Sequence, residues 1–161
     1  MENRFKDILK AIYENIKARS KNLLFQDGYV YPTAFVVVPS KDVLQKIDVI
    51  CVPLNHRNNE EKQSIFAQLN MLAETTGAVG IIHATECYFR MPVDEKDAHI
   101  LPSESEDRKE GLMVTLVGNN ISMGHLTEFE RAGTDITIKR QEEMSGQLKN
   151  NLIIAFNNFN A

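Results

Sequence analysis

The chain has 161 residues, 18 Lys and Arg against 22 Asp and Glu, and a formal net charge of −4. This length is typical of one domain, and an apolar fraction of 43% is enough to form a core. The basic residues are scattered, which argues against nucleic-acid binding. No apolar run approaches the roughly 18 residues of a membrane helix, and MENRFKDILK is unlike a signal peptide. We therefore predict a cytoplasmic protein that does not associate with membranes.

The first quarter of the sequence predicts one helix followed by two strands. Residues 3–19 carry apolar side chains at three- and four-residue spacing, the pattern of an amphipathic helix. Residues 33–38 form an almost wholly apolar, β-branched run, which is typical of a strand covered on both faces or of one in the middle of a sheet. Residues 47–54 predict a second strand, and the charge of Asp48 indicates that this strand is an outer one.

A second helix is predicted over residues 59–75. Asn58 with Glu61 three residues later resembles a helix N-cap signal, and Gly77 is suited to end the helix. Residues 78–89 then predict a third strand, on which His83 shares a face with other odd-numbered residues.

The second half predicts a long acidic excursion and then further strands. The excursion covers residues 91–109, and a fourth strand covers 111–117. Residues 118–120 are Gly-Asn-Asn, which suits a tight hairpin. A fifth strand follows over 121–129, and we expect residues 136–139 to continue it after a break.

These elements predict a single α+β domain over residues 1–161, with a mainly antiparallel sheet of about five strands and two or three helices. The order is αββαβββ, followed by either a helix or a strand over 145–160. This order resembles the profilin-like order of roadblock and longin domains, which implies the sheet order 2-1-5-4-3. A ferredoxin-like or other α+β sandwich is the alternative.

The third and fourth strands should bring charged side chains together at the base of the excursion. If they pair antiparallel, Glu86 comes close to Arg108 and Glu110. A glutamate on an otherwise small, apolar face requires a partner, and Arg108 could supply it. Two interpretations follow: a structural ion pair that closes the base of the excursion, or the mouth of a polar site. Tyr88 and His83 belong to the same predicted polar cluster.

Histidine and cysteine spacings do not indicate a metal or cofactor site. HxH, HExxH and CxxC are missing from the sequence, so we predict neither a metal nor a cofactor. A site assembled from the dispersed residues His83, Glu86 and His99 is the alternative. Cys51 and Cys87 lie in strand-like apolar contexts, where cysteines usually behave as small core residues.

One stretch resembles a group of small uncharacterised bacterial and phage proteins. In these a strand ends in a Ser-Glu-Ala-Trp-like patch, and a Pro-Ser segment then leads to Arg-x-Glu and an apolar strand. The matching residues here are Thr85-Glu86-Cys87-Tyr88, then Pro102-Ser103, Arg108, Glu110 and Leu112 to Val117. Thr85, Cys87 and Tyr88 depart from that pattern. The resemblance covers residues 78–117 and implies a recurring structural unit, without an activity.

Three functional hypotheses follow from the sequence. The first is a binding or interaction module without enzymatic activity, which forms a homodimer through an exposed sheet edge or the 59–75 helix. The second is a small hydrolase or ligand-binding enzyme with a site around Glu86, Arg108 and Glu110. The third is a phage-related accessory protein that binds a host factor.

Overall fold

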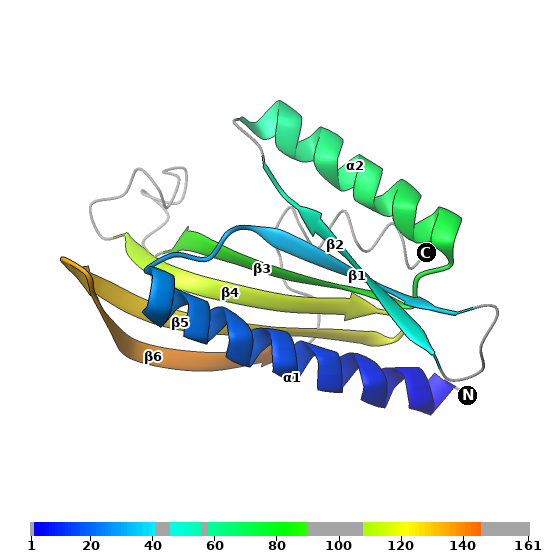
Figure 1. Cartoon of the computed structure of the whole chain (residues 1–161), viewed down its shortest axis with the longest axis horizontal. Helices are drawn as coiled ribbons and strands as arrows, with labels where there is room; N and C mark the ends of the chain where they lie inside the picture. The colour runs from blue at the N-terminus through cyan, green and yellow to red at the C-terminus, as the bar shows by residue number, and fades with distance from the viewer. Residues whose placement is uncertain (1, 41–45, 56–57, 90–107, 146–161) are drawn as a thin grey trace, which may run out of the picture.

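The computed structural model describes residues 2–40, 46–55, 58–89 and 108–145. These residues form two helices and one six-stranded antiparallel sheet (Figure 1), which confirms the predicted α+β class. In chain order the elements are α1 (Glu2–Asp27), β1 (Thr33–Pro39), β2 (Ile47–Pro53), α2 (Asn59–Thr76), β3 (Gly80–Phe89), β4 (Lys109–Gly118), β5 (Ile121–Ala132) and β6 (Asp135–Ser145). Neither helix in this part of the chain combines the length and apolarity needed to cross a membrane.

The strand order is β2-β1-β3-β4-β5-β6, so the predicted order 2-1-5-4-3 is wrong. The strand β1 pairs with β3, with Ala34 opposite His83, instead of with β5. The reason is that β3 to β6 form a meander in which each strand pairs with the next. Because β4 and β6 occupy the two edges of β5, that strand has no edge left for β1. The predicted positions of β1 inside the sheet and of β2 at its end are confirmed.

The strand β6 was not predicted as a separate element. Residues 136–139 were expected to continue the fifth strand, but the chain reverses at Gly133, whose φ is 65°. Asp135–Ser145 then runs back along β5. A glycine can adopt this left-handed conformation without strain, so the Ala132-Gly133 break marks a hairpin turn.

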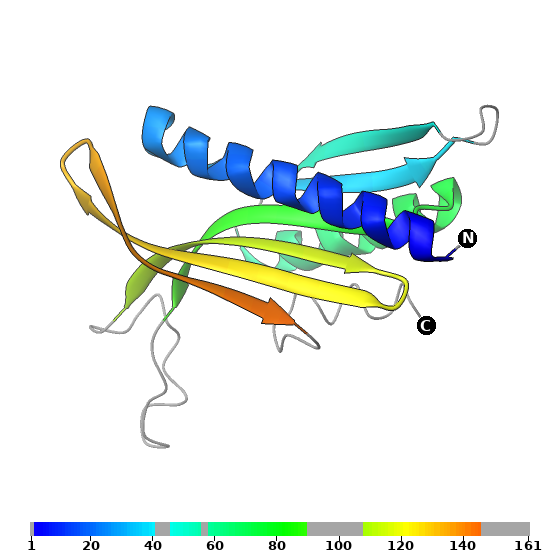
Figure 2. The same cartoon turned by 90° about the horizontal axis from the view of Figure 1, so that it is seen from below.

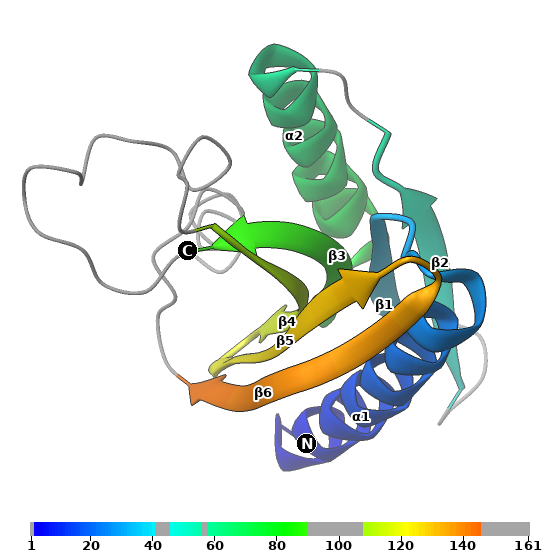
Figure 3. The ribbon, with the colours of Figure 1, turned by 90° about the vertical axis from the view of Figure 1, so that its left-hand side faces the viewer.

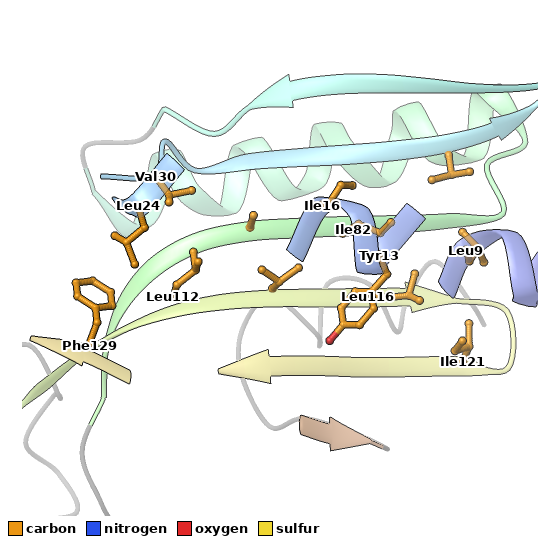
Figure 4. Close-up of a cluster of buried hydrophobic side chains, with 13 residues drawn as sticks. Leu9, Tyr13, Ile16, Leu24, Val30, Ile82, Leu112, Leu116, Ile121 and Phe129 are labelled. Atoms are coloured by element: carbon orange, nitrogen blue, oxygen red, sulfur yellow. The ribbon is translucent and has the colours of Figure 1, made fainter. Parts of the chain in front are cut away.

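The helix α1 covers one face of the sheet and is longer than the predicted 3–19 (Figure 2). Figure 4 shows Leu9, Tyr13 and Ile16 pointing from α1 toward the sheet. The buried residues of this core are Leu9, Tyr13, Ile16, Leu24, Val30, Val37, Ile82, Ala84, Leu112, Val114, Leu116, Ile121 and Phe129. Burial of this apolar stripe holds α1 on the sheet.

The helix α2 lies on the opposite face, so the sheet separates the two helices (Figure 3). The Glu61 backbone N–H donates a 2.9 Å hydrogen bond to the Asn58 side chain, which confirms the predicted N-cap. Gly77 ends the helix in a left-handed conformation, also as predicted. Phe66, Leu69 and Ala73 form the buried stripe of α2.

Candidate functional site

One end of the molecule gathers the predicted site residues. The last turn of α1, the end of β3, the start of β4 and the β5–β6 hairpin lie together there, on the left in Figure 1 and toward the viewer in Figure 3. The register of β3 with β4 places Glu86 opposite Leu112 and Tyr88 opposite Glu110. Because Leu112 belongs to the core beneath α1, Glu86 and Glu110 both lie on the α1 face of the sheet.

Arg131, which was not predicted, is the cation at the centre of this cluster. Its Nη2 contacts Glu86 Oε1, and its Nε lies 3.4 Å from Glu110 Oε2. Its Nη1 donates to the carbonyl oxygen of Gly28, directly after α1. The Val30 backbone N–H also donates to the Glu86 carboxylate. The guanidinium therefore ties the α1–β1 connection to β3, β4 and β5.

The predicted pairing of Glu86 with Arg108 is corrected by this geometry. Glu110 pairs with Phe129 across β4 and β5, and Arg131 follows Phe129 by two residues on the same face. Arg131 therefore reaches Glu86 from a strand that is 45 residues away in the sequence. The only sequence signal for it would have been an extension of the fifth strand beyond residue 129.

The electrostatics of the cluster favour a structural role. Burial raises the pKa of Glu86, while the charge and hydrogen bond of Arg131 and the Val30 N–H oppose that rise. A carboxyl of raised pKa is a feature of some catalytic sites and also of structural ion pairs. Here the guanidinium contacts two carboxylates and a carbonyl oxygen, so its donors are directed into the fold.

Arg108 and Tyr88 form a neighbouring contact. The Arg108 guanidinium lies 5.0 Å from the centre of the Tyr88 ring, in a cation–π arrangement. A shallow pocket of about 340 Å³ opens beside them at the start of β4 and the end of β5. It is lined by Arg108, Lys109, Glu110, Glu128, Phe129, Glu130 and Arg131. Two of the predicted residues, Arg108 and Glu110, thus line the pocket, whereas Glu86 contacts one of its lining residues, Arg131.

Exposed tyrosines lie beside residues of the cluster: Tyr29 and Tyr31 adjoin Val30 in the chain, and Tyr88 is opposite Glu110 in the sheet. Tyr29, Tyr31 and Tyr88 are each 44–48% exposed, and we call these three residues the aromatic surface. The rings of Tyr29 and Tyr31 meet edge to face, with centres 6.1 Å apart. Burial, Tyr31 and the Glu86 carboxylate raise the pKa of Tyr29.

The other candidate residues lie elsewhere. His83 faces away from α1, opposite Thr115, and is only 5% exposed, so it does not join Glu86. Burial raises the pKa of the Cys87 thiol to about 11, which keeps it protonated and poorly nucleophilic. Within the described residues, no group of three His, Cys, Asp or Glu side chains could hold a metal ion. His99 and the Pro102-Ser103 segment lie outside those residues, as do residues 146–161 of the tail.

Comparisons with protein-family models, with curated proteins and with solved structures found no match to this chain. The suspected relation to small bacterial and phage proteins therefore stays a prediction.

Proposed function

We propose that this chain is a protein-binding module that associates with a second copy of itself through the aromatic surface. The observation that carries the proposal is the distribution of exposed large apolar residues. Seven of them are found in the described part of the chain. Four of them, Leu23, Phe25, Tyr29 and Tyr31, fall within nine residues at the end of α1 and the α1–β1 connection, and Tyr88 lies near the end of β3. Single exposed apolar residues are common, whereas a local concentration of them is characteristic of interaction sites.

The residue types support a protein partner. Tyrosine and arginine are enriched in protein interfaces, where aromatic rings contribute a large contact area with few rotatable bonds. Tyr88 with Arg108 above its ring is such a combination. The alternatives considered from the sequence, the sheet edge and the 59–75 helix, each carry one exposed large apolar residue, Val49 on β2 and Met71 on α2.

The charges at this end favour a second copy as the partner. A two-fold interface brings the same surface of both chains together, so that surface must be self-complementary. The Arg108 guanidinium lies over the Tyr88 ring, and the carboxylate-bearing Glu110 is opposite Tyr88 in the sheet. Both signs are therefore present for contacts across a two-fold axis.

Sedimentation velocity over a concentration series tests this proposal. Tyr31→Ala and Tyr88→Ala should each weaken dimerisation by about tenfold or more, as expected of tyrosines at the centre of an interface. Val49→Ala and Met71→Ala are the matched controls, because they remove exposed apolar area elsewhere. A wild-type chain that stays monomeric, or controls that weaken association as much as the tyrosine variants, would contradict the proposal.

A second candidate function is ligand binding at the pocket beside Arg108. The pocket presents three cationic and three carboxylate side chains around Phe129, a composition that suits a small zwitterion. Titration with free amino acids, followed by NMR, should then shift the amide signals of Arg108 and Lys109, and Glu110→Gln should reduce the shifts. Unchanged spectra at millimolar amino acid would contradict this candidate.

A further inference from the structure

A second polar cluster joins β6 to α1 on the same face of the sheet. Its centre is His125 of β5, which is only 6% exposed. Its neighbours on β6 are Gln141 and Glu143, which pair with β5 residues in the strand register. The sequence offered no signal for this cluster, because these polar residues come from three separate segments.

Both ring nitrogens of His125 are engaged. Nδ1 lies 2.8 Å from Glu143 Oε1, and Nε2 lies 3.1 Å from Gln141 Oε1. The other contacts of these two side-chain oxygens show that both oxygens act as acceptors toward the ring. Lys21 Nζ, which can only donate, also contacts Gln141 Oε1, so the amide oxygen of Gln141 faces the ring.

Glu143 faces the ring as an ionised acceptor. Lys17 Nζ donates to its Oε1 at 2.6 Å, and the Tyr13 hydroxyl donates to its Oε2 at 3.3 Å. Burial alone would raise the pKa of Glu143, but the hydrogen bonds from Lys17 and His125 hold it below the usual value. Burial and the facing Glu143 raise the pKa of Tyr13, so its hydroxyl remains a donor.

The ring therefore lies between two acceptors. A neutral imidazole carries one N–H and can satisfy only one of them, whereas an imidazolium donates to both. The other titratable groups in this cluster are Glu14, Lys17 and Lys21 of α1. From β4, the residue opposite His125 is the apolar Val114.

We propose that the protonated His125 ring of β5 holds the edge strand β6 in place through Gln141 and Glu143, the two β6 residues that α1 also contacts, and that loss of the ring proton loosens this strand. When β6 is in place, Glu143 and Gln141 accept from the two N–H groups of the imidazolium. When β6 moves away, water must replace both acceptors. This contact therefore requires the ring proton and is weakened when the ring is neutral.

Hydrogen exchange measured by NMR tests the proposal. The amides of β6 are followed between about pH 5 and pH 8, the range in which histidine titrates, and the rates are corrected for intrinsic exchange. Protection of β6 should fall by about tenfold across the ring titration, the contribution of one charge-assisted hydrogen bond. The nitrogen signals of the His125 ring, recorded on the same wild-type samples, should show two protonated nitrogens at the acidic end.

Two variants separate this contact from other titrations. His125→Gln should abolish the pH-dependent step in β6 protection, whereas His83→Gln, which changes the buried histidine on the other face, should retain it. A flat protection profile in the wild type while the ring titrates would overturn the proposal, and this result does not require either variant to fold. The same pH step in folded His125→Gln would also overturn it.

Discussion

Arg131→Met should destabilise the protein far more than the same substitution at Arg108. The two arginines lie at the same end of the molecule, and sequence reasoning assigned the ion pair to Arg108. In the structure, Arg131 contacts Glu86, Glu110 and the carbonyl of Gly28. Methionine retains much of the apolar stem of the side chain, so the substitution chiefly removes the guanidinium.

The expected loss follows from these three contacts. The side chains of Arg131 and Glu86 are 33% and 24% exposed, so solvent screens their ion pair in part. Each of the two ion pairs should then contribute about 0.5–1 kcal/mol, and the hydrogen bond to Gly28 about 1 kcal/mol. The total is roughly 2–3 kcal/mol, or a fall in Tm of about 5–10 °C for a chain of this size. The cation–π contact that Arg108→Met removes contributes about 1 kcal/mol or less at an exposed site.

Urea unfolding of both variants, followed by circular dichroism, measures the difference. The loss in Arg131→Met should also shrink at acidic pH. Arg131 lowers the pKa of Glu86, so the variant has a higher value than the wild type. The loss of unfolding free energy in Arg131→Met is then greatest at neutral pH, and it decreases as the pH falls and Glu86 becomes protonated. Equal losses in the two variants at neutral pH would refute the assignment of Arg131 as the structural cation.

Three further substitutions or modifications test local features of the fold. Asn58→Ala removes the N-cap of α2 and should lower the free energy of unfolding by about 1 kcal/mol, measured by urea titration. Gly118→Ala would place a Cβ 2.9 Å from the carbonyl oxygen of Val79 and should cost about 1–3 kcal/mol by overpacking, visible as a lower Tm. Iodoacetamide should alkylate the exposed Cys51 at least about tenfold faster than the half-buried Cys87, measured by mass spectrometry; equal rates would contradict the burial of Cys87.

The features that were predictable are those with local signals. Asn58 and Gly77 fix the ends of α2 through hydrogen bonds and a backbone conformation that depend on a few adjacent residues. The apolar run of β1 predicted a strand in the middle of the sheet, and β1 lies between β2 and β3. Such features follow from short stretches of sequence.

The features that were missed depend on distant pairing. The sheet order was wrong because β6 had been merged with the preceding strand, which left β5 free to pair with β1. Arg131 was missed for the same reason, since the strand was expected to end at residue 129 and it continues to Ala132. Glu86 and Glu110 were placed together correctly because the register of β3 with β4 was anticipated.

The most direct test of the proposed function is sedimentation velocity of the wild-type chain over a wide concentration range. Self-association through the aromatic surface predicts that the sedimentation coefficient rises with concentration toward that of a species of twice the chain mass. The same series with Tyr88→Ala should remain near the monomer value over most of that range. A wild-type coefficient that stays at the monomer value up to the highest concentration would contradict the proposal.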